Sequence, residues 1–198
     1  PKRQPNLNVP DPSYHGMVWT EFAKAVGPIA YIVRARFVGL RDLGPALSPT
    51  NAFQIIQGLE TVTLRMEKHC SNAAKVAEYL SSHEKVSRVI YAGLDEGEAG
   101  VRANKYLKGG YGALCGFELK GGKPSGEKFI NNLNMFYHVA NIGDARSLAI
   151  HPATTTHSQL SDEDMESAGV NPSYVRLSIG IEHIDDIIED LKNALEAA

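Results

Sequence analysis

The fold is decided by one short stretch, YVRLSIG at residues 174–180. Apolar and polar side chains alternate through it, which is typical of a strand with one buried face. The apolar face carries Val175, Leu177 and Ile179, and the polar face carries Tyr174, Arg176 and Ser178. We therefore expect a strand that packs on one side and presents a guanidinium on the other.

Two polar segments precede this strand and complete a candidate binding site. They are VANIGD at 139–144 and SLAIHPATTTH at 147–157. We interpret the second segment as a strand that ends in a run of small hydroxyl side chains. A guanidinium offers a planar fork of donors that binds a carboxylate through two parallel hydrogen bonds and stays charged. We interpret the segments as a receptor for a small anion, with Arg176 as the anchor and Asn141 and Thr156 as polar donors nearby.

Arg176 also has a purely structural interpretation. Arginine commonly forms ion pairs with neighbouring acids, and Glu182 and Asp144 are the candidate partners in this sequence. Short motifs produce many false positives. The spacing alone therefore leaves both interpretations of Arg176 open.

The C-terminal part of the chain alternates strand and helix patterns. Strands are predicted at 86–91, 113–119, 139–150 and 174–180, an acidic loop at 93–101, and helices at 125–133, from Ser161 onward and at 184–195. The apolar stripe of the last helix can cover the apolar face of strand 174–180. The predicted fold class is α/β, one sheet with helices packed mainly on one side.

A helical pattern runs through residues 48–82 and begins with a favourable capping pair. Ser48 can cap the helix with its hydroxyl, and Pro49 suits the first helical position because no partner is needed for its missing N–H. We interpret the segment as a long bridging helix. The alternative of two shorter helices that meet near Gly58 stays open.

The N-terminal part has the character of a segment from inside a longer protein. Residues 1–12 lack an initial Met and are rich in proline, so we expect a loop and suspect a fragment. A short helix is predicted at 20–25. Residues 30–37 are interpreted as a strand, with a helix as the alternative, and 39–49 as a loop punctuated by glycine and proline.

Composition excludes several partner classes. The 198 residues carry a net charge of −3, and the basic residues are scattered among the acids, so we expect no nucleic acid and no anionic membrane surface as a partner. No apolar run reaches the roughly 18 residues of a membrane helix, and we interpret the chain as cytoplasmic. Cys70 and Cys115 lack metal-ligand spacing and are expected to be reduced core thiols.

Other site classes find weak support. His138, Asp144, His151 and His157 could suggest a metal, but their spacing does not place three ligands on one strand face or helix turn. The glycine-rich KGGYG at 108–112 lacks the phosphate-loop pattern and precedes a strand. No GxSxG elbow of a serine hydrolase is present. We therefore predict no metal site.

Several separated motifs resemble one known family. HPATTTH at 151–157, followed by VRLSIG at 175–180, is similar to the C-terminal signature of the pyridoxal-phosphate enzymes of cysteine and methionine metabolism. RDLGPALSP at 41–49, QGLET at 57–61 and LRM at 64–66 resemble its O-acetylhomoserine sulfhydrylase branch. These motifs occur in the family's order along nearly the whole chain, which is identified as the C-terminal part of a member.

The resemblance implies a domain organisation. The fold would be the C-terminal small domain of a fold-type I enzyme, preceded by a bridging helix and a remnant of the large domain. Residues 1–47 would be the remnant of the large cofactor-binding domain, 48–82 the bridging helix, and 83–198 the C-terminal α/β domain.

The resemblance also implies an activity. The complete enzyme would use pyridoxal phosphate to replace the acetoxy group of O-acetylhomoserine, released as acetate, with sulfide or methanethiol, giving homocysteine or methionine. Arg176 would bind the substrate α-carboxylate. Asn141 stands where many relatives carry serine, and Thr156 matches a threonine that either touches substrate or holds its loop. The complete enzyme would be a homotetramer.

The resemblance implies an absence as well. In this family the lysine that binds the cofactor follows a short run of serine and threonine, and no lysine here has that context. We therefore expect no catalytic residue, no bound cofactor and no activity in this chain alone. The alternatives are a relative that acts on cystathionine or methionine, or a non-catalytic module that binds small carboxylates or mediates assembly.

Overall fold

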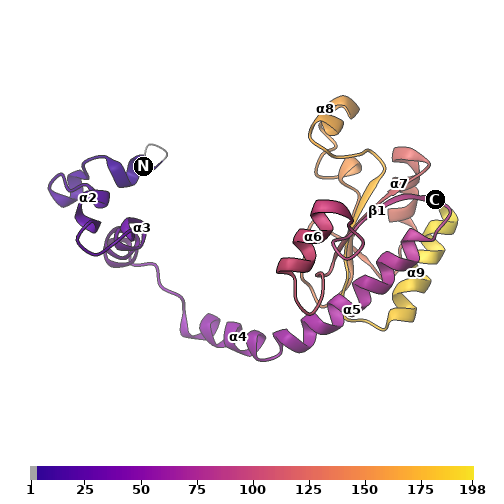
Figure 1. Cartoon of the computed structure of the whole chain (residues 1–198), viewed down its shortest axis with the longest axis horizontal. Coiled ribbons are helices and arrows are strands. Elements are labelled where there is room, and N and C mark those ends of the chain that lie inside the picture. The colour runs from indigo at the N-terminus through magenta and orange to yellow at the C-terminus, as the bar shows by residue number, and fades with distance from the viewer. Residues whose placement is uncertain (1–3) are drawn as a thin grey trace. The chain divides into compact units, whose positions relative to one another are not determined.

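A computed structural model describes residues 4–198 of the chain. The chain divides into two compact units, one that ends at Gly58 and one that runs from Leu59 to Ala198. Figure 1 shows the elements of each unit. The division by residue ranges predicted from the sequence, at 47/48 and 82/83, stays a prediction.

The first unit consists of short helices around one tryptophan. They are α1 (Pro5–Asn8), η1 (Pro12–Tyr14), α2 (Trp19–Ala23), α3 (Ala30–Arg34) and the π-helical η2 (Ala35–Leu43). Trp19 is fully buried, and its indole N–H donates to the carboxylate of Asp11 at 3.0 Å. The rings of Tyr14 and Phe37 lie at 4.8 and 6.0 Å from the Trp19 ring. The predicted short helix is confirmed as α2.

The structure corrects three predictions in this unit. The described part of the predicted loop at 1–12 contains the helix α1, which Pro5 begins at a position where its missing N–H needs no partner. Residues 30–37 are helical, so the strand interpretation is wrong, and the predicted loop from Gly39 is helical as far as Leu43. Only Ile32 and Val33 in this stretch are β-branched, and helical backbone brings Phe37 against Trp19. Tertiary packing therefore outweighs a weak strand propensity.

Residues 48–82 form two consecutive helices, the alternative that the sequence left open. They are α4 (Pro49–Glu60) and α5 (Val62–Ser81), and Thr61 separates them, three residues after Gly58. The hydroxyl of Ser48 accepts the backbone N–H of Asn51 at 3.1 Å, which confirms the predicted cap.

The second unit contains a five-stranded mixed sheet in the order β1-β2-β5-β4-β3. The strands are β1 (Val86–Ile90), β2 (Leu114–Leu119), β3 (Tyr137–His138), β4 (Leu148–Ile150) and β5 (Tyr174–Ser178). All neighbouring pairs are antiparallel except β3 and β4. The stretch at 174–180 therefore supplies the central strand.

Three helices cover one face of this sheet, as predicted. They are α5, α7 (Gly122–Asn131) and α9 (Ile184–Ala197), and α9 contacts both of the others. Figure 1 shows α5 and α9 side by side. Val175, Leu177 and Ile179 are fully buried in the core beneath these helices, together with Ile187, Leu191 and Leu195 of α9. The sheet therefore has one apolar face under helices and one face that is free to carry polar side chains.

Two other helices complete the second unit. α8 (Asp162–Ser167) begins as predicted, with Ser161 as its N-cap accepting the N–H of Asp164 at 3.1 Å. α6 (Gly97–Tyr106) replaces part of the predicted acidic loop. The predicted strand at 139–150 is shorter than expected, because only Leu148–Ile150 and the separate pair Tyr137–His138 are extended.

Candidate functional site

A cavity of about 450 Å³ lies on the polar side of the sheet. Its lining comes from β1, β2, β4 and β5, from the segments that follow β3 and β4, and from the residues just before β5. Arg176 and Thr156, two of the three predicted site residues, both line it. The structure therefore brings together residues that are 20 positions apart in the sequence.

Arg176 projects into this cavity from the centre of the sheet. It stands between Gly116 of β2 and Ile150 of β4 in the strand register. Its Nη2 atom donates to the backbone carbonyl of Asn141 at 3.2 Å. Among residues 4–198, no carboxylate lies within ion-pair distance of this guanidinium. The remaining N–H groups of Arg176 are therefore available to an anion in the cavity.

The two acids that could have paired with Arg176 are engaged elsewhere. Glu182 accepts the N–H of Ser147 at 2.6 Å and its hydroxyl at 3.0 Å. Asp144 accepts the N–H of Arg146 at 3.0 Å, and this contact keeps the pKa of its carboxyl below the ordinary value. The structural interpretation of Arg176 as an ion-pair partner of Glu182 or Asp144 is therefore wrong.

Asn141 supports Arg176 through its backbone. Its carbonyl oxygen accepts from the guanidinium, whereas its side chain is exposed and is not among the residues that line the cavity. The predicted role of the side-chain amide as a substrate donor stays a prediction. What the structure adds is that the segment of Asn141 orients the arginine.

Thr156 lies on the rim of the cavity. Its hydroxyl is 2.9 Å from Nδ1 of His157, which lines the same cavity. Thr156 also lines a second hollow of about 330 Å³, with His138 and Thr155. The hydroxyl run therefore lies at the edge of the site, where it follows β4.

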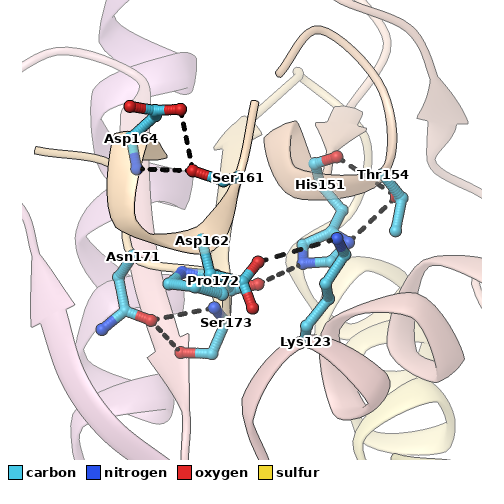
Figure 2. Close-up of polar contacts among 9 residues, drawn as sticks. All are labelled: Lys123, His151, Thr154, Ser161, Asp162, Asp164, Asn171, Pro172 and Ser173. Carbon is cyan, nitrogen blue, oxygen red and sulfur yellow. Dashed lines mark hydrogen bonds and ion pairs between the residues drawn. The ribbon is translucent and has the colours of Figure 1, made fainter. Parts of the chain in front are cut away.

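A buried histidine holds this rim in place (Figure 2). His151 is fully buried; its Nε2 atom lies 2.8 Å from the carbonyl of Pro172, and its Nδ1 atom lies 3.0 Å from the hydroxyl of Thr154. Burial lowers the pKa of His151 below its ordinary value. A carbonyl can only accept, so Nε2 carries the proton, and the Thr154 hydroxyl donates to the backbone carbonyl of His151 at 3.3 Å. His151 thus links the segment after β4 to the segment before β5.

Two further contacts support the same region. Lys123 of α7 lies 4.0 Å from Asp162 at the start of α8, in an exposed ion pair that Figure 2 also shows. Gly126 of α7 lies so close to His151 that a Cβ there would be 2.3 Å from Nε2. Only glycine permits this approach of α7 to the imidazole.

Helix α5 holds the other end of β5. His69 Nδ1 lies 2.6 Å from the carbonyl of Ile179, and Asn72 donates to the carbonyls of Gly180 and Glu182 at 3.1 and 2.9 Å. Both side chains are buried. The chain direction immediately after Arg176 is therefore set by a helix more than 100 residues earlier in the sequence.

Sequence reasoning missed several polar residues of the cavity, among them Arg88, Glu118 and Tyr174, although it placed Tyr174 on the correct face. Arg88 and Glu118 are cross-strand partners and form an ion pair at 3.6 Å. Glu118 and Tyr174 are partners in the next pair of strands. Alternation within β1 and β2 could have indicated which side chains share a face with Arg176. The residues that stand opposite one another depend on strand register, and no local pattern determines it.

The structure also describes the two cysteines, the candidate metal ligands and the helix lengths. Cys115 is fully buried and Cys70 partly buried, and neither forms a disulfide. Burial raises the pKa of Cys115 to about 12. Within residues 4–198, no three His, Cys, Asp or Glu side chains are grouped so as to hold a metal ion. In the same range, no helix has the length and apolar character needed to cross a membrane.

The sequence is similar to one known family and to several of its members. Residues 15–196 match the family described as Cys/Met metabolism PLP-dependent enzymes. The chain is 53% identical to the O-acetyl-L-homoserine sulfhydrylase of Leptospira meyeri, over 96% of this chain and 45% of that protein. It is 49% identical to the homocysteine synthase of Schizosaccharomyces pombe, over 100% of this chain and 45% of that protein.

The structure agrees with these matches. A crystal structure from Campylobacter jejuni, described as an O-acetylhomoserine (thiol)-lyase with a pyridoxyl-lysine monophosphate, superimposes with a TM-score of 0.81 at 42% identity. The match covers 98% of this chain and 45% of that one. The chain thus spans slightly less than half the length of the relatives it matches. Sequence and structure agree that it belongs to the family of Cys/Met metabolism PLP-dependent enzymes.

Proposed function

We propose that this chain is the substrate-binding part of an O-acetylhomoserine sulfhydrylase. The complete enzyme would convert O-acetylhomoserine and sulfide, or methanethiol, to homocysteine or methionine. The names of the relatives support this assignment. In line with the family resemblance, we also propose that the complete enzyme is a cytoplasmic homotetramer.

One observation carries the proposal: Arg176 lies in a cavity without a carboxylate partner. A charged guanidinium that residues 4–198 leave without an ion-pair partner, but hold through the Asn141 carbonyl, is suited to bind a carboxylate from outside. In the proposed reaction this group is the α-carboxylate of O-acetylhomoserine. Binding it at a fixed point orients the bonds at the substrate Cα. Misplacement by about 1 Å can lower a rate on the order of a hundredfold.

The cavity does not supply a site for the cofactor by itself. Pyridoxal phosphate enzymes require a lysine that bonds to the cofactor, and none of the residues that line the Arg176 cavity is a lysine. We propose that the lysine and the cofactor belong to another part of the complete enzyme, and that this chain alone is inactive. Arg176 therefore has a binding role, and no chemical step is assigned to it.

The test uses the complete enzyme with Arg176→Ala and Arg176→Lys. We expect both variants to raise KM for O-acetylhomoserine and to lower kcat/KM by about tenfold or more, with Lys less damaging than Ala because it keeps the charge but loses the fork. KM for sulfide should change little. Unchanged kinetics for both variants would contradict the proposal.

One observation favours a second function, a non-catalytic module that binds small carboxylates. Because the cavity contains the anchor but no lysine, the chain by itself could bind small carboxylates without chemistry. Calorimetric titration of the 198-residue chain with homoserine tests this. Binding that Arg176→Ala abolishes, together with no sulfhydrylase activity in the complete protein, would support a non-catalytic module.

A further inference from the structure

Tyr174 lines the same cavity as Arg176, and its hydroxyl group is a candidate donor to a ligand there. The two residues lie on one face of β5, two positions apart, and both line the cavity. Among residues 4–198, the Tyr174 hydroxyl makes no hydrogen bond, although the residue is partly buried. A partly buried phenol that has a donor to offer and no partner is suited to a ligand.

The position of the phenol is set by a glycine on the neighbouring strand. A Cβ at Gly116 would lie 2.4 Å from both the hydroxyl oxygen and a ring carbon of Tyr174. The Tyr174 ring therefore lies directly over Gly116. Gly116 is also the cross-strand partner of Arg176 in β2 and β5. The hydroxyl is thus brought beside the residue that carries the guanidinium, and no side chain intervenes at Gly116.

The charges around the phenol favour an external partner. Glu118 is the cross-strand partner of Tyr174, and its carboxylate pairs with Arg88 at 3.6 Å instead of with the phenol. Burial raises the pKa of Tyr174 above its ordinary value, while Arg176 opposes this shift. The phenol is therefore a neutral donor near a fixed positive charge. An anion held by Arg176 would find a second donor there.

We propose that Tyr174 is a second substrate-binding residue, whose hydroxyl donates a hydrogen bond to the carboxylate that Arg176 holds. The inference rests on the proposed function and extends it. The guanidinium supplies charge and a planar fork, and the phenol adds a donor at a different angle. Together they select a carboxylate in one orientation, where a single arginine would admit several.

The test compares Tyr174→Phe, Arg176→Lys and a control in the complete enzyme. Tyr174→Phe keeps the ring over Gly116 and removes only the hydroxyl. We expect KM for O-acetylhomoserine to rise about tenfold, as is typical for losing a hydrogen bond to a charged group, while KM for sulfide stays unchanged. Tyr79→Phe, at a partly buried phenol on the helical side of the sheet, should match the wild type.

The outcomes separate the two proposals. Tyr174→Phe with wild-type KM, alongside an impaired Arg176→Lys, would overturn the inference and leave the proposed function standing. Wild-type kinetics for both variants would overturn the proposed function and the inference with it. An equal rise of KM for O-acetylhomoserine and for sulfide would overturn the inference, because a general structural effect would then explain the loss.

A second pair of variants tests the geometry on which the inference depends. Gly116→Ala should displace the Tyr174 ring and raise KM for O-acetylhomoserine at least as much as Tyr174→Phe. In a Tyr174→Ala background, where the ring is gone, Gly116→Ala should have no additional effect on KM. An equal effect of Gly116→Ala in both backgrounds would show that the ring does not lie over this glycine. If Gly116→Ala does not fold, Tyr174→Phe decides the question.

Discussion

The imidazole of His151 lies 2.8 Å from the carbonyl oxygen of Pro172, and this buried contact joins the two segments that border the Arg176 cavity. Pro152 and Thr156 follow the histidine, and Tyr174 follows the proline by two positions. The imidazole is buried as a neutral group, and its pKa is lowered mainly by loss of hydration. Several properties of the site depend on this contact.

Stability should depend on pH through His151. Its pKa in the folded chain lies below the unfolded value of about 6.5, so the unfolded state binds the proton more readily. The free energy of unfolding is therefore greatest above that value and falls as pH drops through it toward the folded pKa. Urea unfolding of the second unit at pH 7.5 and 5.5 measures this. His151→Gln should reduce the dependence, and an identical dependence in that variant would contradict the assignment.

Gly126→Ala should weaken the same region. The new Cβ would lie 2.3 Å from His151 Nε2, so α7 or the imidazole must move. We expect a loss of about 1–3 kcal/mol in the free energy of unfolding, the usual range for overpacking. Gly39→Ala is the control, because a Cβ there meets nothing within 4 Å. Equal stability of the two variants would show that α7 and His151 are not in close contact.

Asp190→Ala should destabilise the second unit. This buried carboxylate of α9 accepts the backbone N–H groups of Asn134, Met135 and Phe136 at 2.9, 2.9 and 3.3 Å. Its removal leaves these donors without their acceptor, at a cost of about 2–4 kcal/mol. Chemical denaturation measures the loss. The exposed Glu189 on the same helix gives the matched control, and a similar loss for Glu189→Ala would exclude a special role for Asp190.

The two thiols should differ in their reaction with iodoacetamide. Cys115 is fully buried, and its pKa is raised to about 12, so almost no thiolate is present at pH 8. Cys70 is partly exposed on α5. Mass spectrometry after partial labelling should find modification at Cys70 first and at Cys115 only in denaturant. Labelling of Cys115 in the folded chain at a comparable rate would contradict the buried position.

Local patterns were sufficient to predict the central strand and its two faces. The alternation of Val175, Leu177 and Ile179 identifies the buried side because each successive side chain in a strand reverses direction. The cap at Ser48 and the acidic start of α8 are equally local, and both were predicted correctly. Such features depend on neighbours within a few residues, which a sequence displays directly.

Elements with a weak or mixed pattern were harder to predict. The region of α6 contains acids and glycines that suggested a loop, yet Gly100 is buried against the carbonyl of Asp95, where a Cβ would lie at 2.3 Å. Glu98 and Arg102 form an ion pair one turn apart at 3.6 Å. The glycine is thus needed for packing, and a sequence does not distinguish that need from flexibility.

The site was predicted in part. Arg176 and Thr156 were identified through motifs and meet at one cavity, but Tyr174, Arg88 and Glu118 were not assigned to it. Their grouping depends on the register of three strands and on the absence of a side chain at Gly116. Long-range pairing of this kind is set by the whole core.

The hydrogen bonds between α5 and the segment that follows β5 predict which mutations will affect the Arg176 cavity. His69 and Asn72 hold the carbonyls of Ile179, Gly180 and Glu182, just beyond Arg176. A lesion in this helix should therefore have the phenotype of a binding-site mutant, although it lies more than 100 codons upstream of Arg176. A selection for suppressors of a weakened Arg176 site should accordingly recover second-site changes in α5 as well as at the cavity wall.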